Sequence, residues 1–169
     1  MCGIVGYVGS RQAVPVLLGA LKRLEYRGYD SAGLAVTNGD GISVYKKAGK
    51  VKTLGSSLSE AWSDQSQQQA TCGVAHTRWA THGAPSTRNA HPHLDQSGRI
   101  ALVHNGIIEN YRDIQRHLEN QGHEFRSETD SEALAHLIGS CYTETGDLLE
   151  ATSAALRRVE GTFGIAVVC

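Results

Sequence analysis

The sequence predicts a single domain of the α+β class, with strands and helices interspersed along the chain. At 169 residues it is long enough for one domain with its own core. Short apolar runs rich in β-branched residues alternate with segments in which apolar residues recur at helical spacing. Between two of those runs, Asn-Gly-Asp-Gly at 38–41 is a strong hairpin signal. The hairpin predicts antiparallel pairing.

The first half of the chain is expected to hold a strand, a helix, the hairpin and a second helix. Residues 3–9 form a short apolar strand, and Ser10 has the character of a helix cap. Apolar residues then follow at helical spacing: Val14, Leu17, Leu18, Leu21 and Leu24. The hairpin strands are predicted at 34–36 and 42–47. The polar stretch 56–69 predicts a short helix followed by a surface loop.

The second half predicts further buried strands at 72–76 and 99–104, separated by a histidine-rich loop. Helices are predicted over 109–121, from a capping box at Thr129-x-x-Glu132 to about 141, and from Asp147-x-x-Glu150 to just before Gly161. The apolar run 162–169 predicts a last buried strand. Because such a strand needs partners on both sides, we expect a domain truncated at its C-terminus.

Composition excludes several classes of function. The formal net charge of −1 offers no basic field for nucleic acid. No apolar run approaches the roughly 20 residues of a membrane span, and the first residues do not resemble a secretory signal. The four cysteines include no CxxC pair, so we expect thiols in a reducing compartment and a cytoplasmic location.

Cys2 is the first candidate for chemistry. Removal of Met1 would leave one residue with both a thiol and a free α-amine, and an N-terminal amine can activate its own nucleophile. The alternative is a small apolar residue without catalytic function, the more common case for a cysteine near an N-terminus.

Asn105-Gly106 and the pair Arg78 and Asp130 are the next candidates. The Asn105 amide and the Gly106 N–H are the two donors that an oxyanion hole requires, although Asn-Gly also favours a hairpin turn. Residues 107–110 enter a helix, which argues against the turn. Arg78 suits a carboxylate and Asp130 an ammonium group, so together they would hold a free amino acid. A surface salt bridge and a helix N-terminal charge are the alternatives.

Clustered histidines raise a metal site as a competing hypothesis. The cluster comprises His76, His82, His91, His93 and His104, with Cys72 as a possible further ligand. The spacing matches no common ligand pattern, and we expect His76 and His104 to face opposite ways. We therefore predict no metal.

Six segments together resemble the N-terminal glutaminase domain of class II glutamine amidotransferases. Their sequences resemble those of the glucosamine-6-phosphate synthase branch of that family. They are 1–6 (MCGIVG), 24–33 (LEYRGYDSAG), 76–83 (HTRWATHG), 89–93 (NAHPH), 104–110 (HNGIIEN) and 127–130 (SETD). The resemblance implies an N-terminal-nucleophile hydrolase fold, an αββα sandwich of two largely antiparallel sheets. Residues 1–169 would form an incomplete glutamine amidotransferase type 2 domain, without sugar isomerase domains.

Roles follow from this resemblance. Cys2 would be the catalytic nucleophile, Asn105 and Gly106 the oxyanion hole, and Arg27 a residue that orders the site. Arg78 would bind the glutamine carboxylate and Asp130 its α-amine. The remaining substrate-side residues implied are Trp79, Thr81 and His82 in a loop that closes over glutamine, and His91 near a domain interface.

The implied reaction is hydrolysis of glutamine to glutamate and ammonia through a γ-glutamyl thioester, with no cofactor. Ammonia would pass to a C-terminal sugar isomerase domain that binds fructose-6-phosphate, in an enzyme expected to be a homodimer. Two alternatives stay open. The first is a glutaminase domain that serves another acceptor, and the second is an inactive fragment that acts as a binding module.

Overall fold

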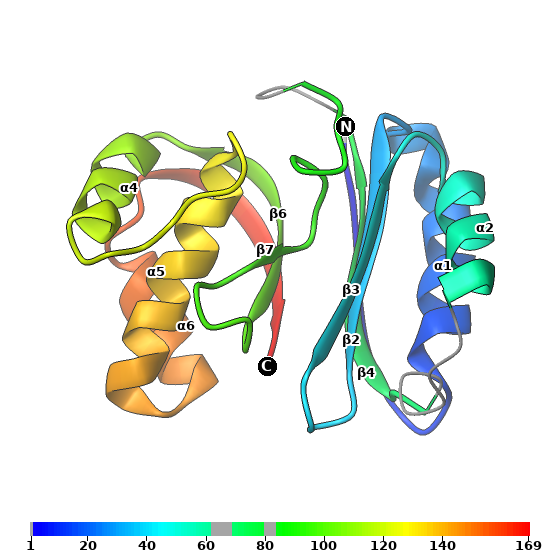
Figure 1. The fold of residues 1–169 in the computed structure, drawn as a ribbon, viewed down its shortest axis with the longest axis horizontal. Coiled ribbons are helices and arrows are strands. Elements are labelled where there is room, and N and C mark those ends of the chain that lie inside the picture. The colour runs from blue at the N-terminus through cyan, green and yellow to red at the C-terminus, as the bar shows by residue number, and fades with distance from the viewer. Residues whose placement is uncertain (1, 62–68, 80–83) are drawn as a thin grey trace.

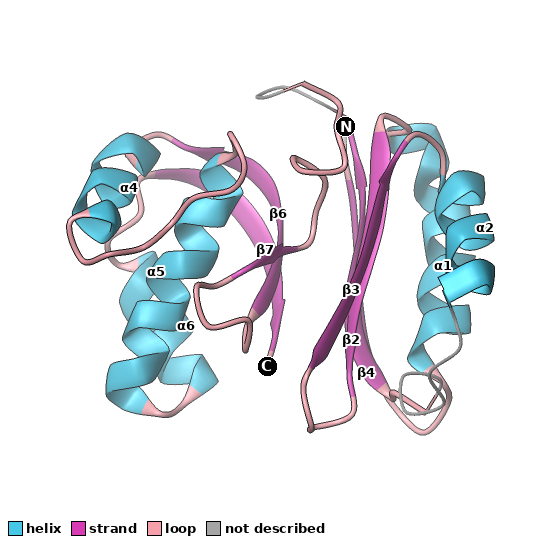
Figure 2. Ribbon diagram, viewed as in Figure 1, coloured by secondary structure: helices cyan, strands magenta, loops and turns pink. Residues whose placement is uncertain are grey.

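The computed structural model describes residues 2–61, 69–79 and 84–169. Two antiparallel sheets face each other, and helices cover the outer face of each (Figures 1 and 2). The layers therefore run helix, sheet, sheet, helix, which confirms the predicted α+β class and the sandwich of two sheets. No described helix is long and apolar enough to cross a membrane.

The first sheet has the strand order β1-β4-β2-β3, with every pair antiparallel. Its strands are β1 (Gly3–Val8), β2 (Ser31–Thr37), β3 (Ile42–Ala48) and β4 (Cys72–Arg78). Two helices, α1 (Ala13–Leu24) and α2 (Val51–Ala61), cover its outer face, and a short 3₁₀ helix, η1 (Glu25–Arg27), follows α1. The chain starts at the edge strand β1, whose register sets Gly3 opposite Thr77.

The second sheet has the order β5-β6-β7 and is also antiparallel. Its strands are β5 (His93–Leu94), β6 (Ala101–Ile108) and β7 (Gly161–Val168). Its outer helices are α4 (Tyr111–Glu119), α5 (Asp130–Thr145) and α6 (Leu148–Leu156). Helix α5 lies against the sheet and is buried along most of its length, because α4 and α6 pack on its other sides.

The core is divided by the sheets. One apolar cluster fills the space between the first sheet and its helices, and another fills the space between the second sheet and its helices. Mostly small side chains form the layer between the two sheets: Ala35, Val74, Ala101, Val103 and Val168. Small residues there allow the sheets to approach closely, so that groups from both can meet at one end of the sandwich.

Several local predictions need correction. Helix α1 begins at Ala13 with Gln12 as its N-cap, so Ser10 is not the cap. Helix α2 spans 51–61 rather than starting at 56, because its apolar residues pack beneath the first sheet. Of the side chains of β7, only Val168 is buried. Among the described residues this strand pairs with β6 alone, so the predicted buried strand is largely exposed or half-buried.

Candidate active site

A cavity of about 420 Å³ lies where the two sheets meet. The first sheet contributes His76 and Arg78 from β4, with Cys2 immediately before β1. The second sheet contributes Asn105 and Gly106 from β6. The other lining residues are Arg27, Trp79, His91, His104, Ile107, Thr129, Asp130 and Thr162.

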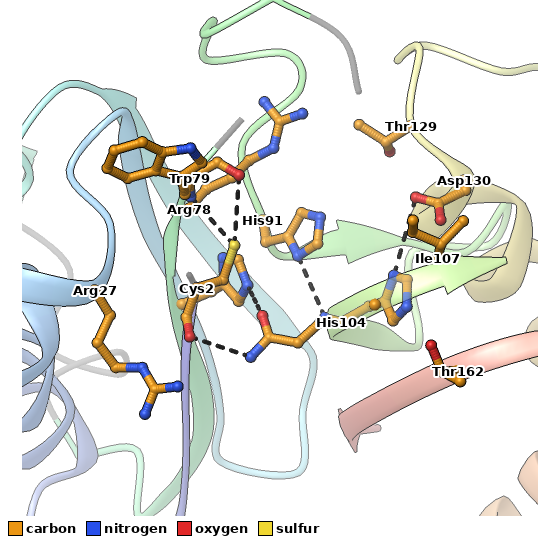
Figure 3. A pocket seen from close by; sticks show the side chains of 13 residues that line it. Cys2, Arg27, Arg78, Trp79, His91, His104, Ile107, Thr129, Asp130 and Thr162 are labelled. Carbon is orange, nitrogen blue, oxygen red and sulfur yellow. Dashed lines mark hydrogen bonds and ion pairs between the residues drawn. The ribbon is translucent and has the colours of Figure 1, made fainter. Parts of the chain in front are cut away.

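Most of the predicted site residues therefore lie in one place. Those that line the cavity are Cys2, Arg27, Arg78, Trp79, His91, Asn105, Gly106 and Asp130 (Figure 3). The predictions for Thr81 and His82 fall outside the described residues. Three lining residues, Ile107, Thr129 and Thr162, are not predicted as site residues by the sequence. Thr162 lies far along the chain on β7, and no local pattern in the sequence marks it.

The Cys2 thiol points toward the end of β4. Antiparallel pairing of β1 with β4 brings Cys2 beside Trp79, whose backbone N–H donates a hydrogen bond to Sγ at 3.2 Å. Figure 3 shows the sulfur turned toward Arg78 and Trp79, whereas the guanidinium of Arg27 points away from it. Strand pairing thus fixes the position of the thiol at the cavity wall.

Arg78 is the last residue of β4 and is buried. Burial lowers the pKa of its guanidinium, and electrostatic interactions with Cys2, Asp30 and Asp130 oppose that shift. The segment that contains Gly28 and Asp30 packs against the backbone of Arg78. A Cβ on Gly28 would lie 2.8 Å from the carbonyl carbon of Arg78, and the Asp30 N–H donates to the Arg78 carbonyl at 3.1 Å. Glycine at 28 is what lets the loop reach the end of β4.

Asp130 lies on the opposite side of the cavity, at the first residue of α5 (Figure 3). Its Oδ2 accepts a hydrogen bond from the Ile108 N–H at 2.9 Å, and its side chain is 14% exposed. Arg78 from β4 and Asp130 from α5 therefore present opposite charges to one cavity. That arrangement fits a ligand with both a carboxylate and an ammonium group.

Asn105 and Gly106 lie inside β6, where they pair with Gly164 and Phe163 of β7. The strand predicted to end at 104 therefore continues to Ile108, because β7 supplies a distant partner. Gly106 has φ +132°, and a Cβ there would lie 2.0 Å from the Thr162 carbonyl oxygen. Only glycine fits that position.

A hydrogen-bond pair orients the Asn105 amide. Its Oδ1 lies 2.8 Å from Nε2 of His76, and its Nδ2 donates to the Cys2 carbonyl at 3.4 Å. The Asn105 side-chain amide therefore lies between His76 of β4 and Cys2, which carries the thiol. The sequence suggests His76 as a candidate metal ligand, whereas the structure makes it a partner of Asn105.

Buried histidines pack together at one wall of the cavity, where His76, His91 and His104 line it. The ring of His91 lies 4.3 Å from that of His76 and 4.8 Å from that of His93, and its Nδ1 accepts the His104 N–H at 3.3 Å. The expectation that His76 and His104 face opposite ways is wrong, because both pack around His91. Among the described residues no three His, Cys, Asp or Glu side chains are placed to hold a metal ion.

Burial keeps this cluster neutral. Desolvation lowers the pKa of His76 to about 4, with contributions from His104 and Arg78. Burial likewise lowers the pKa of His91 and of His93 well below the usual value, and neighbouring histidines add to the effect. Burial also lowers the pKa of His104, against the opposing charge of Asp130. Neutral imidazoles are therefore the state at neutral pH.

A lysine outside the cavity anchors the segment that carries His91. Lys46 of β3 donates from Nζ to the carbonyls of Ala90 at 2.9 Å, Pro92 at 3.2 Å and Arg88 at 3.4 Å. Burial lowers the pKa of Lys46 to about 8. The segment between the sheets is thus tied to the first sheet by one side chain.

Comparison with known proteins identifies the family. Residues 76–169 match the family model described as a glutamine amidotransferase domain. The chain belongs to this family. The family predicted from the sequence motifs is thereby confirmed, and the cavity around Cys2 is the candidate active site of a glutamine amidotransferase domain.

Relatives in this family are similar over the whole chain. It is 55% identical, over its full length, to glutamine–fructose-6-phosphate aminotransferase [isomerizing] of Symbiobacterium thermophilum, and covers 27% of that protein. Against the enzyme of the same name in Thermus thermophilus it is 54% identical over 99% of its length, and covers 26% of it. The chain thus spans about a quarter of the length of these relatives.

Solved structures show the same fold. The glutamine phosphoribosylpyrophosphate (PRPP) amidotransferase from B. subtilis, complexed with ADP and GMP, superimposes with a TM-score of 0.78 at 25% identity. That match covers 99% of this chain and 35% of the other. The αββα arrangement predicted for the chain is therefore that of a solved amidotransferase.

Proposed function

We propose that this chain hydrolyses the side-chain amide of glutamine, with Cys2 as the nucleophile. The observation that carries the proposal is that Cys2, Asn105 and Gly106 line the same cavity as the oppositely charged Arg78 and Asp130. A cavity of about 420 Å³ is ample for one amino acid. Family membership supports the same reaction.

Substrate recognition would depend on the two charged walls. Arg78 would hold the α-carboxylate of glutamine and Asp130 its α-ammonium group, which leaves the side-chain amide directed toward the thiol. Burial of Arg78 strengthens this interaction, because a desolvated guanidinium pairs more strongly with a carboxylate. Trp79, Thr81 and His82 would cover the bound substrate, His91 would support the wall behind it, and Arg27 would order the loop beside Cys2.

The mechanism follows from a free α-amine on Cys2. The amine accepts the thiol proton, and the sulfur forms a bond to the carbonyl carbon of the glutamine amide. Negative charge develops on the carbonyl oxygen, where the Asn105 amide and the Gly106 N–H donate to it. The C–N bond then breaks as the protonated α-amine of Cys2 returns its proton to the leaving nitrogen, which departs as ammonia. Water hydrolyses the remaining γ-glutamyl thioester to glutamate.

This mechanism requires removal of Met1, which lies outside the described residues. While Met1 is attached, the Cys2 nitrogen is an amide and has no basic lone pair. We predict that protein whose mass retains Met1 releases no ammonia from glutamine, whereas the processed form does. Equal turnover by both forms would show that the α-amine is not the base.

The ammonia is proposed to serve the isomerising aminotransferase reaction on fructose-6-phosphate. Support comes from the identity with enzymes of that name, which is about twice the identity with the PRPP amidotransferase. A sugar isomerase domain would then be the partner of this domain, in a homodimer. Ammonia transfer by the complete natural polypeptide to fructose-6-phosphate, and none to phosphoribosylpyrophosphate, is the expected result.

Modification of Cys2 tests the core of the proposal. An electrophilic glutamine analogue should label Cys2 alone, and Cys2→Ala should lose ammonia release by at least about a thousandfold. The matched control is Cys169→Ala, because Cys169 is an exposed thiol remote from the cavity. It should keep full activity and labelling. Unchanged turnover in Cys2→Ala would refute the proposal.

A further inference from the structure

We propose that His76 is a positioning residue that fixes which way the Asn105 side-chain amide points. This inference rests on the proposed function, in which the Asn105 N–H₂ group donates to the oxyanion. An asparagine amide has two orientations of nearly equal shape, related by a half-turn about the last bond. Only the orientation with Nδ2 toward Cys2 offers donors to the reacting carbonyl. Some group must select it.

His76 is placed to make that selection. It lies in β4, between β1 and β2, opposite Ile4 on one side and Gly33 on the other. It is 1% exposed, and its ring packs on that of His91 at 4.3 Å. Gly33 permits this packing, because a Cβ there would lie 2.1 Å from the His91 carbonyl oxygen. The His76 ring is therefore held in position from two sides.

The tautomer of His76 follows from its surroundings. A neutral imidazole carries one N–H, and burial keeps this ring neutral above a pKa of about 4. Nδ1 has no hydrogen bond of good geometry among the described residues, although the His104 backbone also acts on the ring and raises its pKa, whereas Nε2 lies 2.8 Å from Oδ1 of Asn105. An amide oxygen can only accept, so its 2.8 Å contact with Nε2 requires a proton on that nitrogen. The proton is therefore on Nε2, and His76 donates to Oδ1.

The donated hydrogen bond fixes the amide. With Oδ1 turned to His76, Nδ2 is directed to the Cys2 side and donates to the Cys2 carbonyl at 3.4 Å. The reverse orientation would set two acceptors together at Cys2 and two N–H groups together at His76. Both contacts would be repulsive. His76 thus acts through Asn105, without contact with the substrate carbonyl.

A double-mutant cycle on the complete natural polypeptide tests this role. In the parent, His76→Phe removes the donor but keeps a buried ring, and we expect kcat for glutamine hydrolysis to fall by roughly 10- to 100-fold with KM within about twofold. In the Asn105→Ala background the same change should have no further effect on kcat, since there is no amide to orient.

Further variants separate positioning from structure. His76→Gln restores a side-chain N–H and should recover kcat to within about threefold of the parent. His76→Met also lacks a donor, but its flexible side chain fills the space differently from phenylalanine. It should reproduce the loss of kcat seen with His76→Phe. His136→Phe is the matched control: His136 is equally buried, in α5, and remote from this cavity. It should leave kcat unchanged.

Two results would overturn the proposal, and they are distinguishable. If Asn105→Ala lowers kcat and the loss from His76→Phe is the same in both backgrounds, the His76 role is wrong while the proposed function stands. If Asn105→Ala keeps full kcat, the oxyanion role of Asn105 in the proposed function fails, and the role of His76 fails with it.

Discussion

Gly106 shows at the residue scale how one side chain, or its absence, decides the site. Its φ of +132° and the 2.0 Å that would separate a Cβ at this position from the Thr162 carbonyl oxygen exclude every other residue. The sequence pointed to Gly106 as a donor because it follows Asn105. The requirement for glycine itself comes from β7, whose backbone closes on that position. Chemistry and packing thus select the same residue for different reasons.

We predict that Gly106→Ala lowers the free energy of unfolding by at least about 1–3 kcal/mol, the usual cost of a strained backbone position, and abolishes most glutamine hydrolysis. The matched control is Gly164→Ala, because Gly164 lies next to it in the ladder, has no positive φ and has nothing within 4 Å of its Cβ position. Urea denaturation compares the two. Equal loss of stability in both variants would contradict the explanation.

At the scale of single elements, the N-termini of α5 and α6 can be compared with the caps that the sequence predicts. Asp147 caps α6 as its sequence pattern predicts, accepting a hydrogen bond from the Glu150 N–H at 2.8 Å. Thr129 is the N-cap of α5, but the prediction of a capping box between Thr129 and Glu132 is wrong. Thr129 bonds His93 instead, and Glu132 accepts from the Arg126 and Ser127 N–H groups. A distant partner, His93, thus redirects the Thr129 side chain, and backbone N–H groups just before the helix redirect that of Glu132.

We predict that Asp147→Ala lowers the free energy of unfolding by about 1 kcal/mol, because one of the first N–H groups of α6 loses its acceptor. Asp113→Ala is the control. Asp113 is 79% exposed on α4 and pairs with Arg116 at 3.5 Å, a kind of surface pair that contributes little. Thermal and urea unfolding should separate the two variants. No difference between them would show that the cap is not stabilising.

At the scale of the whole molecule, the two sheets meet over a set of neutral histidines. His76, His91, His93 and His104 come from β4, from β5 and the segment just before it, and from β6, and all are buried. Their pKa values lie below the usual 6.5 of an unfolded chain. Below pH 6.5 the unfolded chain therefore binds more protons than the folded one, so stability falls as pH decreases.

We predict that the urea midpoint falls steadily from pH 6.5 toward pH 4, the interval between the unfolded value and the pKa of His76. His91→Phe removes one buried imidazole and should make this fall shallower. His117→Phe is the control, because His117 is exposed on α4. An identical slope in the parent and in His91→Phe would contradict the assignment of acid sensitivity to these histidines.

Local sequence patterns by themselves determined the family, most elements and the candidate residues. Apolar spacing, the 38–41 turn and the Asp147 cap depend on residues within one or two turns of each other, so they can be read along the chain. The same holds for Arg78 and Asp130, whose charges suggest a carboxylate and an ammonium group as ligands.

Only the tertiary structure decided how these residues meet. The pairing of β6 with β7 keeps Asn105 and Gly106 inside a strand, and the approach of the two sheets brings His76 to an amide 29 residues away. Such contacts depend on burial and on the fit between distant elements, and no short-range pattern encodes them. The tautomer of His76, and the orientation of Asn105 that it selects, exist only in the assembled sandwich.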